Sequence, residues 1–408
     1  MCIRDSKHIE DKAAALWGSR KSFISLGGAS HCIISAILAA ASSSSKKVLV
    51  PRNAHRSVLE ALCLADLEPI WYEPSFDEEF NTWSKTTPQT IEESLSRLKD
   101  KGQQAALVIV VSPTYTGKIS NIAAIKTVTS KCQTMLLVDE AHGAHFLTAP
   151  SAVQAGADLV AHSLHKTLSG LTQTGILHVG KDCPLSDIEI KSTLSRLTST
   201  SPSYLLLASI EAAIDLLSSQ RGKSLLDQLL RLGKAAQETI EKDQLALMAR
   251  DTSATHIFLK PIYGSGSTGG QATVMELKAH LESLGIYAEA QLGAGLLFML
   301  GIGSEEADID CLTSALRSFK QKQNQNKKDK TLDHAAKFSK PQPIKSLMTP
   351  YEASCKKKLL VRAQDAENRV SAEFFAPCPP GIPLLVPGQL ISKEVLESTQ
   401  KEQFLVVA

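Results

Sequence analysis

The stretch that decides the fold is Thr134-Met-Leu-Leu-Val-Asp139-Glu-Ala-His142-Gly-Ala-His145. Its first half is a short apolar run that ends in an acid, which is typical of a buried strand followed by a loop. A second apolar run, Ala157–Ala161, leads into His162-Ser163-Leu-His165-Lys166. The two runs place an acid and a lysine at two strand ends. The sequence between them is long enough for one crossover between neighbouring parallel strands.

Further apolar runs extend this pattern toward the N-terminus. Lys47–Pro51 and Ala106–Ser112 are bounded by polar or turn residues and favour buried strands. Stretches with helical spacing alternate with them: Ser57–Ala65, Thr90–Leu98 and Ile119–Ser130. This alternation indicates an α/β fold with a mostly parallel sheet covered on both faces. Ligands of such sheets bind beyond the carboxyl ends of the strands, where Asp139 and Lys166 are expected.

The acid and the lysine are the residue types that pyridoxal phosphate needs. A lysine amine forms a Schiff base with an aldehyde, and a carboxylate facing the pyridine nitrogen keeps it protonated, so that the ring withdraws electrons. Ser163 carries a hydroxyl close enough in sequence to Lys166 to reach the cofactor phosphate. Taken singly, an acid at a strand end and a surface lysine are common structural features. Asp-Glu-Ala-His-Gly upstream of Ser-Leu-His-Lys is far rarer by chance.

Two upstream segments are compatible with the same cofactor. Phe23–His31 is a short strand that runs through the glycine turn Gly27-Gly28-Ala29-Ser30 into the apolar helix Cys32–Ala41. A helix N-terminus after a glycine turn offers N–H groups to a phosphate, although a tight turn without a ligand explains the same residues equally well. His55 follows the strand Lys47–Pro51, where its ring could stack on a flat cofactor. A core or solvent-facing role is the default for any single histidine.

The composition excludes several classes of protein. The chain has 408 residues, 43% hydrophobic and 21% charged, with a formal net charge of +2, so nothing favours nucleic acid or a membrane surface as partner. No apolar run reaches the roughly 18 residues that span a bilayer. The eight cysteines form no C-x-x-C pair and favour a reducing cytoplasm, with buried or inert thiols. A zinc cluster of His142, His145 and His165 is disfavoured because no metal-type spacing is present and Lys166 would have no role.

We expect three domains and a linker. A major domain over residues 1–190 precedes a small α+β domain over 191–320, in which Ser203–Leu217, Ser224–Lys242 and Thr273–Leu284 have helical spacing and Ala254–Leu259 and Gly295–Leu300 favour strands. Residues 321–346 are polar and charged and indicate a linker. Residues 347–408 form a small C-terminal domain around a proline-rich turn. Gly264–Gly270 lacks the spacing of a phosphate loop and is interpreted as a surface loop.

Several motifs together resemble the Orn/Lys/Arg decarboxylase family of fold type I pyridoxal-phosphate enzymes, especially its short bacterial arginine-decarboxylase-like branch. The motifs follow one another along nearly the whole chain. They are Val50–Ser57, Ser112–Gly117, Val138–His145, Ser163–Ser169, Leu171–Thr174, Ser199–Ser209 and Pro379–Gly388. The resemblance implies an aspartate-aminotransferase-like major domain with a mostly parallel sheet, a small α+β domain and a C-terminal α+β domain.

The resemblance also implies roles for individual residues. Lys166 would carry the cofactor as a Schiff base and Asp139 would pair with the pyridine nitrogen. His55 would stack on the ring. The phosphate would be held by Ala29, Ser30 and Ser163, and His142 and His165 would lie beside the cofactor to orient it or move protons. The reaction implied is decarboxylation of a basic amino acid, arginine before lysine or ornithine, to agmatine or a diamine for polyamine synthesis.

The chain departs from the family pattern in three places. A His-x-Pro-Gly-His-type segment expected before the glycine turn is missing, so the chain is expected to be truncated at its N-terminus, with Met1–Ser6 foreign. Gln389 stands where the family usually has glutamate; the loss of that carboxylate either weakens recognition of a cationic substrate or has little effect. Gly28-Ala29 replaces the hydroxyl residues that the family commonly has at this turn, which shifts phosphate binding toward backbone N–H groups.

Alternatives remain open at this level. Another fold type I reaction, such as transamination or aldol cleavage, is a rival, as is a decarboxylase-like subunit without catalysis. Either His165 or Lys166 could protonate the substrate Cα. A cationic substrate needs an acid, and the candidates Glu140, Glu352 and Glu373 cannot be ranked. Because the pocket of this fold is commonly completed at a two-fold interface, we expect at least a homodimer.

Overall fold

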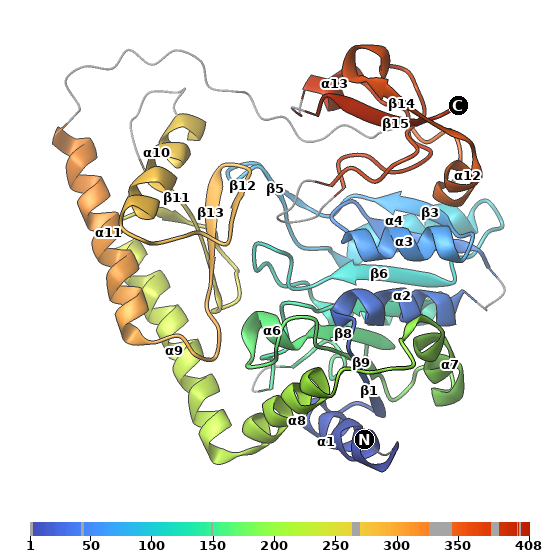
Figure 1. Cartoon of the computed structure of the whole chain (residues 1–408), viewed down its shortest axis with the longest axis horizontal. Coiled ribbons are helices and arrows are strands. Elements are labelled where there is room, and N and C mark those ends of the chain that lie inside the picture. The colour runs from blue at the N-terminus through green and yellow to red at the C-terminus, as the bar shows by residue number, and fades with distance from the viewer. Residues whose placement is uncertain are drawn as a thin grey trace.

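The computed structural model describes residues 3–41, 45–147, 150–262, 270–325, 345–376, 383–397, 399 and 401–408. The centre of the major domain is a seven-stranded sheet with the strand order β1-β9-β8-β7-β6-β2-β3. Its strands are β1 (Lys21–Ser25), β2 (Lys47–Pro51), β3 (Glu68–Tyr72), β6 (Leu107–Val111), β7 (Met135–Asp139), β8 (Leu159–Ser163) and β9 (Gly175–Val179). The strands from β8 to β3 are parallel, and β9 is antiparallel to both of its neighbours. The expectation of a mostly parallel sheet is therefore confirmed (Figure 1).

Helices cover both faces of this sheet because its central strands are apolar on both sides. One face packs against α2 (Gly28–Ala40), α3 (Arg56–Leu64) and α7 (Asp187–Leu197). The other packs against α1 (Ile3–Trp17), α4 (Pro88–Lys99), α5 (Ile122–Lys131) and α8 (Tyr204–Ser218). Helix α5 starts three residues later than the predicted helix Ile119–Ser130, because the Asn121 side chain accepts the N–H of Ala124 and caps it there.

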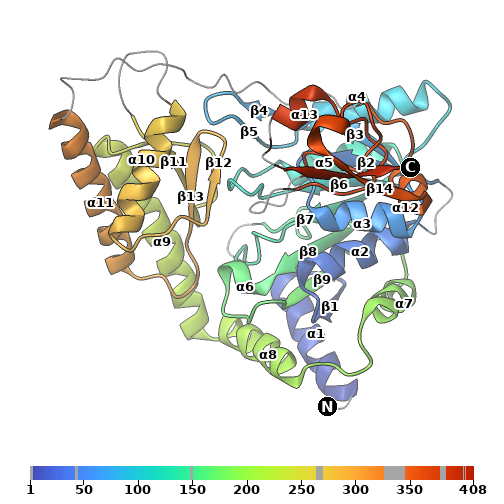
Figure 2. The ribbon, with the colours of Figure 1, turned by 45° about the horizontal axis from the view of Figure 1, so that its top comes forward.

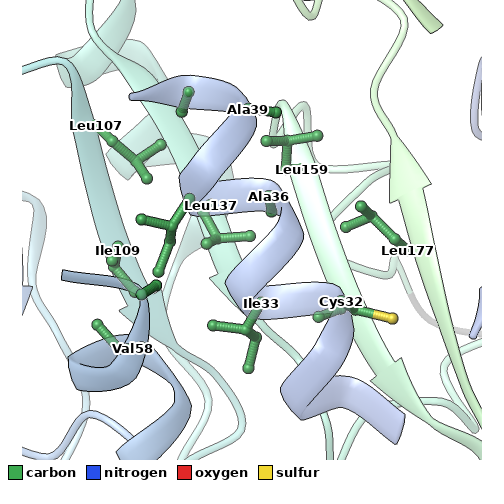
Figure 3. Packing of buried hydrophobic residues seen from close by; sticks show 14 of the residues in the cluster. Cys32, Ile33, Ala36, Ala39, Val58, Leu107, Ile109, Leu137, Leu159 and Leu177 are labelled. Atoms are coloured by element: carbon green, nitrogen blue, oxygen red, sulfur yellow. The ribbon is translucent and has the colours of Figure 1, made fainter. Parts of the chain in front are cut away.

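The apolar face of α2 is the main contact between a helix and the sheet. Ile33, Ala36 and Ala39 of α2 point at leucines of the central strands, among them Leu137 and Leu159 (Figure 3). Full burial of a side chain such as Ile33 contributes roughly 1.5–3 kcal/mol. This packing fixes where the first turn of α2 lies relative to the ends of the strands.

The small domain is built on a second, antiparallel sheet. It has the order β10-β11-β13-β12 and comprises β10 (Leu247–Met248), β11 (His256–Lys260), β12 (Ala290–Leu292) and β13 (Gly295–Met299). Three helices pack on it: α9 (Gln220–Lys242), α10 (Gly270–Ser283) and α11 (Glu306–Gln325). Helix α11 continues to Gln325, into the range expected to be linker. The segment Gly264–Gly270 lies, apart from its last residue, outside the described residues.

The C-terminal part has a small core of its own. Strands β14 (Lys358–Arg362) and β15 (Gln403–Val407) pair antiparallel, with α12 (Pro350–Cys355) and α13 (Lys393–Glu397) beside them. Helix α12 contacts α3 of the major domain, and the small domain lies at the opposite end of the molecule (Figures 1 and 2). The centre of the proline-rich turn, residues 377–382, lies outside the described residues. Met1–Ser6 falls mostly within α1, which starts at Ile3.

Candidate active site

The predicted acid and lysine lie at neighbouring strand ends. Asp139 is the last residue of β7 and stands in register with Ala161 of the parallel strand β8. Lys166 follows β8 within the single-turn helix α6 (Leu164–Thr167). Asp139 is 5% exposed, and its Oδ1 accepts the N–H of Ala141 at 3.1 Å. The predicted crossover therefore brings a buried carboxylate and a half-buried amine to one edge of the sheet.

His142 and His165 both lie beside Lys166. His142 Nε2 is 3.0 Å from Lys166 Nζ, and burial holds the pKa of His142 well below its usual value, with the Lys166 charge acting in the same direction. His165 donates from Nδ1 to the Thr174 carbonyl at 3.3 Å. Burial lowers the pKa of His165, and this carbonyl partly opposes the shift. The His142 imidazole thus contacts the amine, and His165 is the neighbour of Lys166 in the chain.

His55 joins this group from the turn between β2 and α3. It is the N-cap residue of α3, and its Nδ1 accepts the N–H of Ser57 at 3.1 Å, which fixes the ring orientation. Burial lowers the pKa of His55; the Asp139 carboxylate opposes that shift and Lys166 reinforces it. Because the charges of Asp139 and Lys166 both act on this imidazole, His55 lies near both residues.

The first turn of α2 is a candidate anion cradle that lies against the start of β9. Ser25 at the end of β1 and Ser163 at the end of β8 both stand in register with Gly175, the first residue of β9. A Cβ on Gly175 would lie 2.5 Å from the Gly28 carbonyl carbon and 2.8 Å from the Ala29 nitrogen, so the helix touches the strand. The N–H groups of Ala29 and Ser30 lie in that first turn, where helices have no internal acceptor.

Two features of this cradle fit a phosphate. The N-cap of α2 is Gly27, which has no side chain to occupy the first-turn N–H groups. Ser163 is the N-cap residue of α6, yet its hydroxyl makes no capping bond in the described chain. Ala29 is buried and Ser30 is exposed, so Ala29 contributes backbone and Ser30 both backbone and hydroxyl. The donor set suits the phosphate end of pyridoxal phosphate, with Lys166 at hand for its aldehyde.

Sequence reasoning missed His256 and Tyr115. His256 of β11 is fully buried, and its Nε2 lies 3.3 Å from His142 Nδ1. The Tyr115 ring stands edge-on to the His142 ring, with centroids 5.0 Å apart. A histidine inside the apolar run Ala254–Leu259 was a signal, but by itself it does not distinguish a site residue from a core residue.

Glu140 does not serve as an acid of this site. It is buried, and its carboxylate accepts the N–H of Ala152 at 3.0 Å and contacts His162 Nε2 at 2.8 Å. The chain of contacts continues from His162 Nδ1 to His178 Nε2 at 3.0 Å, and from His178 Nδ1 to Ser22 Oγ at 2.7 Å. Burial raises the pKa of Glu140, and its bond to His162 opposes that shift. This network ties β7, β8, β9 and β1 together.

The other two candidate acids are also engaged elsewhere. Exposed Glu352 accepts the Thr349 N–H at 2.7 Å in the capping box of α12. Glu373 accepts the Leu405 N–H at 2.9 Å and pairs with Lys401. Gln389 is buried: its Oε1 accepts the Val386 N–H at 3.0 Å, and its Nε2 has no partner within the described chain.

Metal ligation and membrane insertion find no support in the described residues. Among them, no group of three or more His, Cys, Asp and Glu side chains is arranged to hold a metal ion. His145 contacts Ser253 and Thr255 instead, at 3.2 and 3.4 Å. No helix in the described part of the chain is both long and apolar enough to cross a bilayer. The six described cysteines are free thiols.

The fold is that of fold type I pyridoxal-phosphate enzymes. The structure is similar to the lysine decarboxylase LdcF of Francisella novicida, with a TM-score of 0.78 and 19% identity over 98% of this chain and 72% of that one. It is also similar to the serine palmitoyltransferase of Sphingomonas wittichii, with a TM-score of 0.60 and 16% identity over 79% and 78%. These likenesses show the fold.

The sequence narrows the class to one family. Residues 5–265 match the family model "Orn/Lys/Arg decarboxylase, major domain", and residues 332–405 match "Orn/Lys/Arg decarboxylase, C-terminal domain". The chain therefore belongs to the Orn/Lys/Arg decarboxylase family, whose members are pyridoxal-phosphate-dependent basic amino acid decarboxylases.

The named relatives include both arginine and lysine decarboxylases. The chain is 30% identical to an arginine decarboxylase of Bacillus anthracis over 97% of this chain and 80% of the relative. It is 29% identical to an arginine decarboxylase of Bacillus subtilis over 95% and 79%. It is also 24% identical to the constitutive lysine decarboxylase of Escherichia coli over 94% and 66%.

Proposed function

We propose that this chain decarboxylates a basic amino acid with pyridoxal phosphate, and that arginine is preferred over lysine and ornithine. The observation that carries the proposal is the meeting of His55, Asp139 and Lys166 at one edge of the sheet, beside the first turn of α2. The preference for arginine is supported by the arginine decarboxylases among the relatives.

Each part of the cofactor would find a matching group. The phosphate would be held by Ala29 and Ser30 at the start of α2 and by the Ser163 hydroxyl. His55 would cover the ring, and Asp139 would pair with its nitrogen. When bound, the cofactor supplies an aldehyde that Lys166 and the substrate amine compete for, together with a ring that withdraws electrons from the substrate Cα.

The chain itself must hold and move one proton, because decarboxylation replaces carbon dioxide at Cα by a proton. Lys166 Nζ and the His165 ring are the candidates to deliver it. His142 Nε2, at 3.0 Å from Lys166 Nζ, is placed to exchange a proton with the amine. The burial that keeps these imidazoles neutral leaves one nitrogen of each as an acceptor.

Glu289 is the acid that we assign to the cationic end of the substrate. Its Oε1 accepts a hydrogen bond from the Tyr115 hydroxyl at 3.0 Å, and the Tyr115 ring contacts His142. The exposed carboxylate of Glu289 is thus connected to the site through one aromatic side chain, whereas Glu140, Glu352 and Glu373 are engaged elsewhere.

We further propose that the chain acts as a homodimer in a reducing cytoplasm. The free thiols of the described cysteines support the compartment. Gel filtration with light scattering tests the assembly, and a stable, cofactor-loaded monomer would count against the dimer.

The testing experiment is amine release from arginine, lysine and ornithine by the purified chain with added pyridoxal phosphate. We expect agmatine from arginine, and loss of turnover to background in Lys166→Ala. Lys131→Ala, a change on the surface of α5, is the control and keeps full turnover. Turnover in Lys166→Ala contradicts the proposal. Release of a keto acid identifies a transaminase, and bound cofactor without any turnover identifies a non-catalytic subunit.

A further inference from the structure

A chain of hydrogen bonds continues from Lys166 into the small domain. Lys166 Nζ lies 3.0 Å from His142 Nε2, and His142 Nδ1 lies 3.3 Å from His256 Nε2. The other nitrogen of His256, Nδ1, lies 3.0 Å from Thr255 Oγ1. His142 is 5% exposed, and His256 and Thr255 are fully buried. The reactive amine is thus connected through two shielded imidazoles to a hydroxyl of the second domain.

The placement of His256 does not depend on His142. Its N–H donates to the Ser253 carbonyl at 3.0 Å, and its carbonyl accepts from Gln237 Nε2 of α9 at 3.0 Å. The loop after β6 leaves room for it, because a Cβ on Gly117 would lie 2.6 Å from His256 Cβ. Gly117 has φ +86°, which favours glycine. The backbone of the small domain and this glycine together hold the ring against His142.

The donor and acceptor roles along this series of hydrogen bonds run in one direction. Burial lowers the pKa of His256 to about 3 and that of His142 well below its usual value, so both rings are neutral and each has one donor and one acceptor nitrogen. A protonated Lys166 amine donates to His142 Nε2. His142 must then carry its own proton on Nδ1 and donate it to His256 Nε2. His256 in turn donates from Nδ1 to the Thr255 hydroxyl.

We infer that His256 is a positioning residue: it accepts the Nδ1 proton of His142 and so keeps His142 Nε2 available as the hydrogen-bond acceptor of the protonated Lys166 amine. The inference rests on the function proposed for Lys166. His256 acts on that amine through His142.

Removing the nitrogens of His256 affects the two states of Lys166 unequally. With a protonated amine, His142 would be left with a buried N–H and no acceptor, which proteins rarely tolerate. With a neutral amine, His142 would be left with an unpaired acceptor nitrogen, which is tolerated better. Loss of His256 therefore favours the neutral amine. The other titratable groups that act in this site, His55, His145, His165 and Asp139, remain in place.

The test measures the protonation of Lys166 in the cofactor-free full chain. Acetic anhydride labels neutral amines, and mass spectrometry of the Lys166 peptide gives the labelling rate at each pH. In His256→Phe the midpoint of this profile should fall by about one pH unit, which is roughly tenfold faster labelling below the midpoint. The plateau rate at high pH reports access to the amine separately. His280→Phe, on α10, is the matched control and should leave the midpoint unchanged.

His256→Gln distinguishes hydrogen bonding from packing. A glutamine amide can accept from His142 and donate to Thr255, so the midpoint should stay at the wild-type value. A wild-type midpoint in folded His256→Phe overturns the inference, and so does an equal fall in His256→Gln and His256→Phe. If His256→Phe does not fold, Gly117→Ala replaces it as the test, because the added Cβ displaces the His256 ring and should lower the midpoint. An unchanged midpoint in Gly117→Ala would also contradict the inference.

The labelling experiment uses neither substrate nor cofactor. A midpoint shift in a chain without decarboxylase activity would support the role of His256 and contradict the proposed function. An active decarboxylase without the shift would contradict the role of His256 alone.

Discussion

Gly175 and Gly28 approach so closely that a Cβ on Gly175 would lie 2.5 Å from the Gly28 carbonyl carbon. The first residue of β9 therefore sets the position of the first turn of α2. The two glycines come from distant parts of the chain. Gly175 has backbone atoms where a larger residue would have a side chain, whereas Gly28 has φ +67°, which favours glycine. Any side chain added at Gly175 must move the proposed phosphate cradle.

Gly175→Ala should therefore weaken cofactor binding. The added methyl group pushes α2 away from β9, and overpacking of this kind destabilises a fold by about 1–3 kcal/mol. We expect the Kd for pyridoxal phosphate, measured by absorbance titration, to rise at least about tenfold. Gly303→Ala is the control because a Cβ there meets no described atom within 4 Å. An unchanged Kd in folded Gly175→Ala would mean that this turn does not hold the phosphate.

Asp139→Asn should lower turnover while leaving the fold intact. The amide keeps an oxygen to accept the Ala141 N–H, as Oδ1 does now at 3.1 Å, but removes the negative charge. Loss of one preorganised electrostatic partner reduces kcat on the order of 100- to 1,000-fold. Steady-state amine release measures the effect, and Asp187→Asn on the surface of α7 should retain wild-type kcat. Near-normal kcat in Asp139→Asn is the contrary result.

The buried histidines should make the protein less stable in mild acid. Burial lowers the pKa of His145 and of His256 to about 3, below the unfolded value of 6.5. Their contribution is complete above pH 6.5 and declines as the pH falls toward the folded pKa, because the unfolded chain binds the protons. Each lowers the free energy of unfolding by up to about 1.4 kcal/mol for every pH unit below 6.5. Glu140, whose folded pKa is raised, acts in the opposite direction near its own range.

Urea unfolding at several pH values from 7.5 down to about 5 measures this dependence. His145→Gln removes one titrating group, so its free energy of unfolding should fall less steeply with decreasing pH than that of the wild type. The exposed control His8→Gln should keep the wild-type slope. Equal slopes in His145→Gln and the wild type would show that His145 does not titrate on unfolding in this range.

Glu289→Gln should weaken substrate binding more than it slows the reaction. The Tyr115 hydroxyl can still donate to the amide oxygen, so the ring beside His142 stays in place. An exposed charge pair contributes up to about 1 kcal/mol, so KM for arginine should rise about fivefold with little change in kcat. Glu282→Gln, which removes a carboxylate paired with Lys278 on α10, should leave KM unchanged. Equal KM values in Glu289→Gln and wild type would require another acid.

The part of the site that sequence could predict is the part that local patterns determine. Asp139 and Lys166 each follow an apolar strand, and the parallel arrangement of neighbouring strands brings such ends together. His256 could not be predicted, since its role depends on how a second domain packs on the first. Glu140 is a residue that sequence adjacency wrongly suggests for the site. It directly follows Asp139, but successive side chains along a strand point to opposite faces, and its carboxylate is bound to His162.

The hydrogen bond between His142 and His256 joins residues 114 positions apart. His256 belongs to β11, which pairs with β13, a strand that ends at Met299. Protein synthesis proceeds from the N-terminus, and domains form in that order. A growing chain that has emerged as far as Gly175 already contains Asp139 and Lys166, yet it lacks the ring that holds His142. The surroundings of the Lys166 amine are therefore completed late in synthesis, after the ribosome has passed the second sheet.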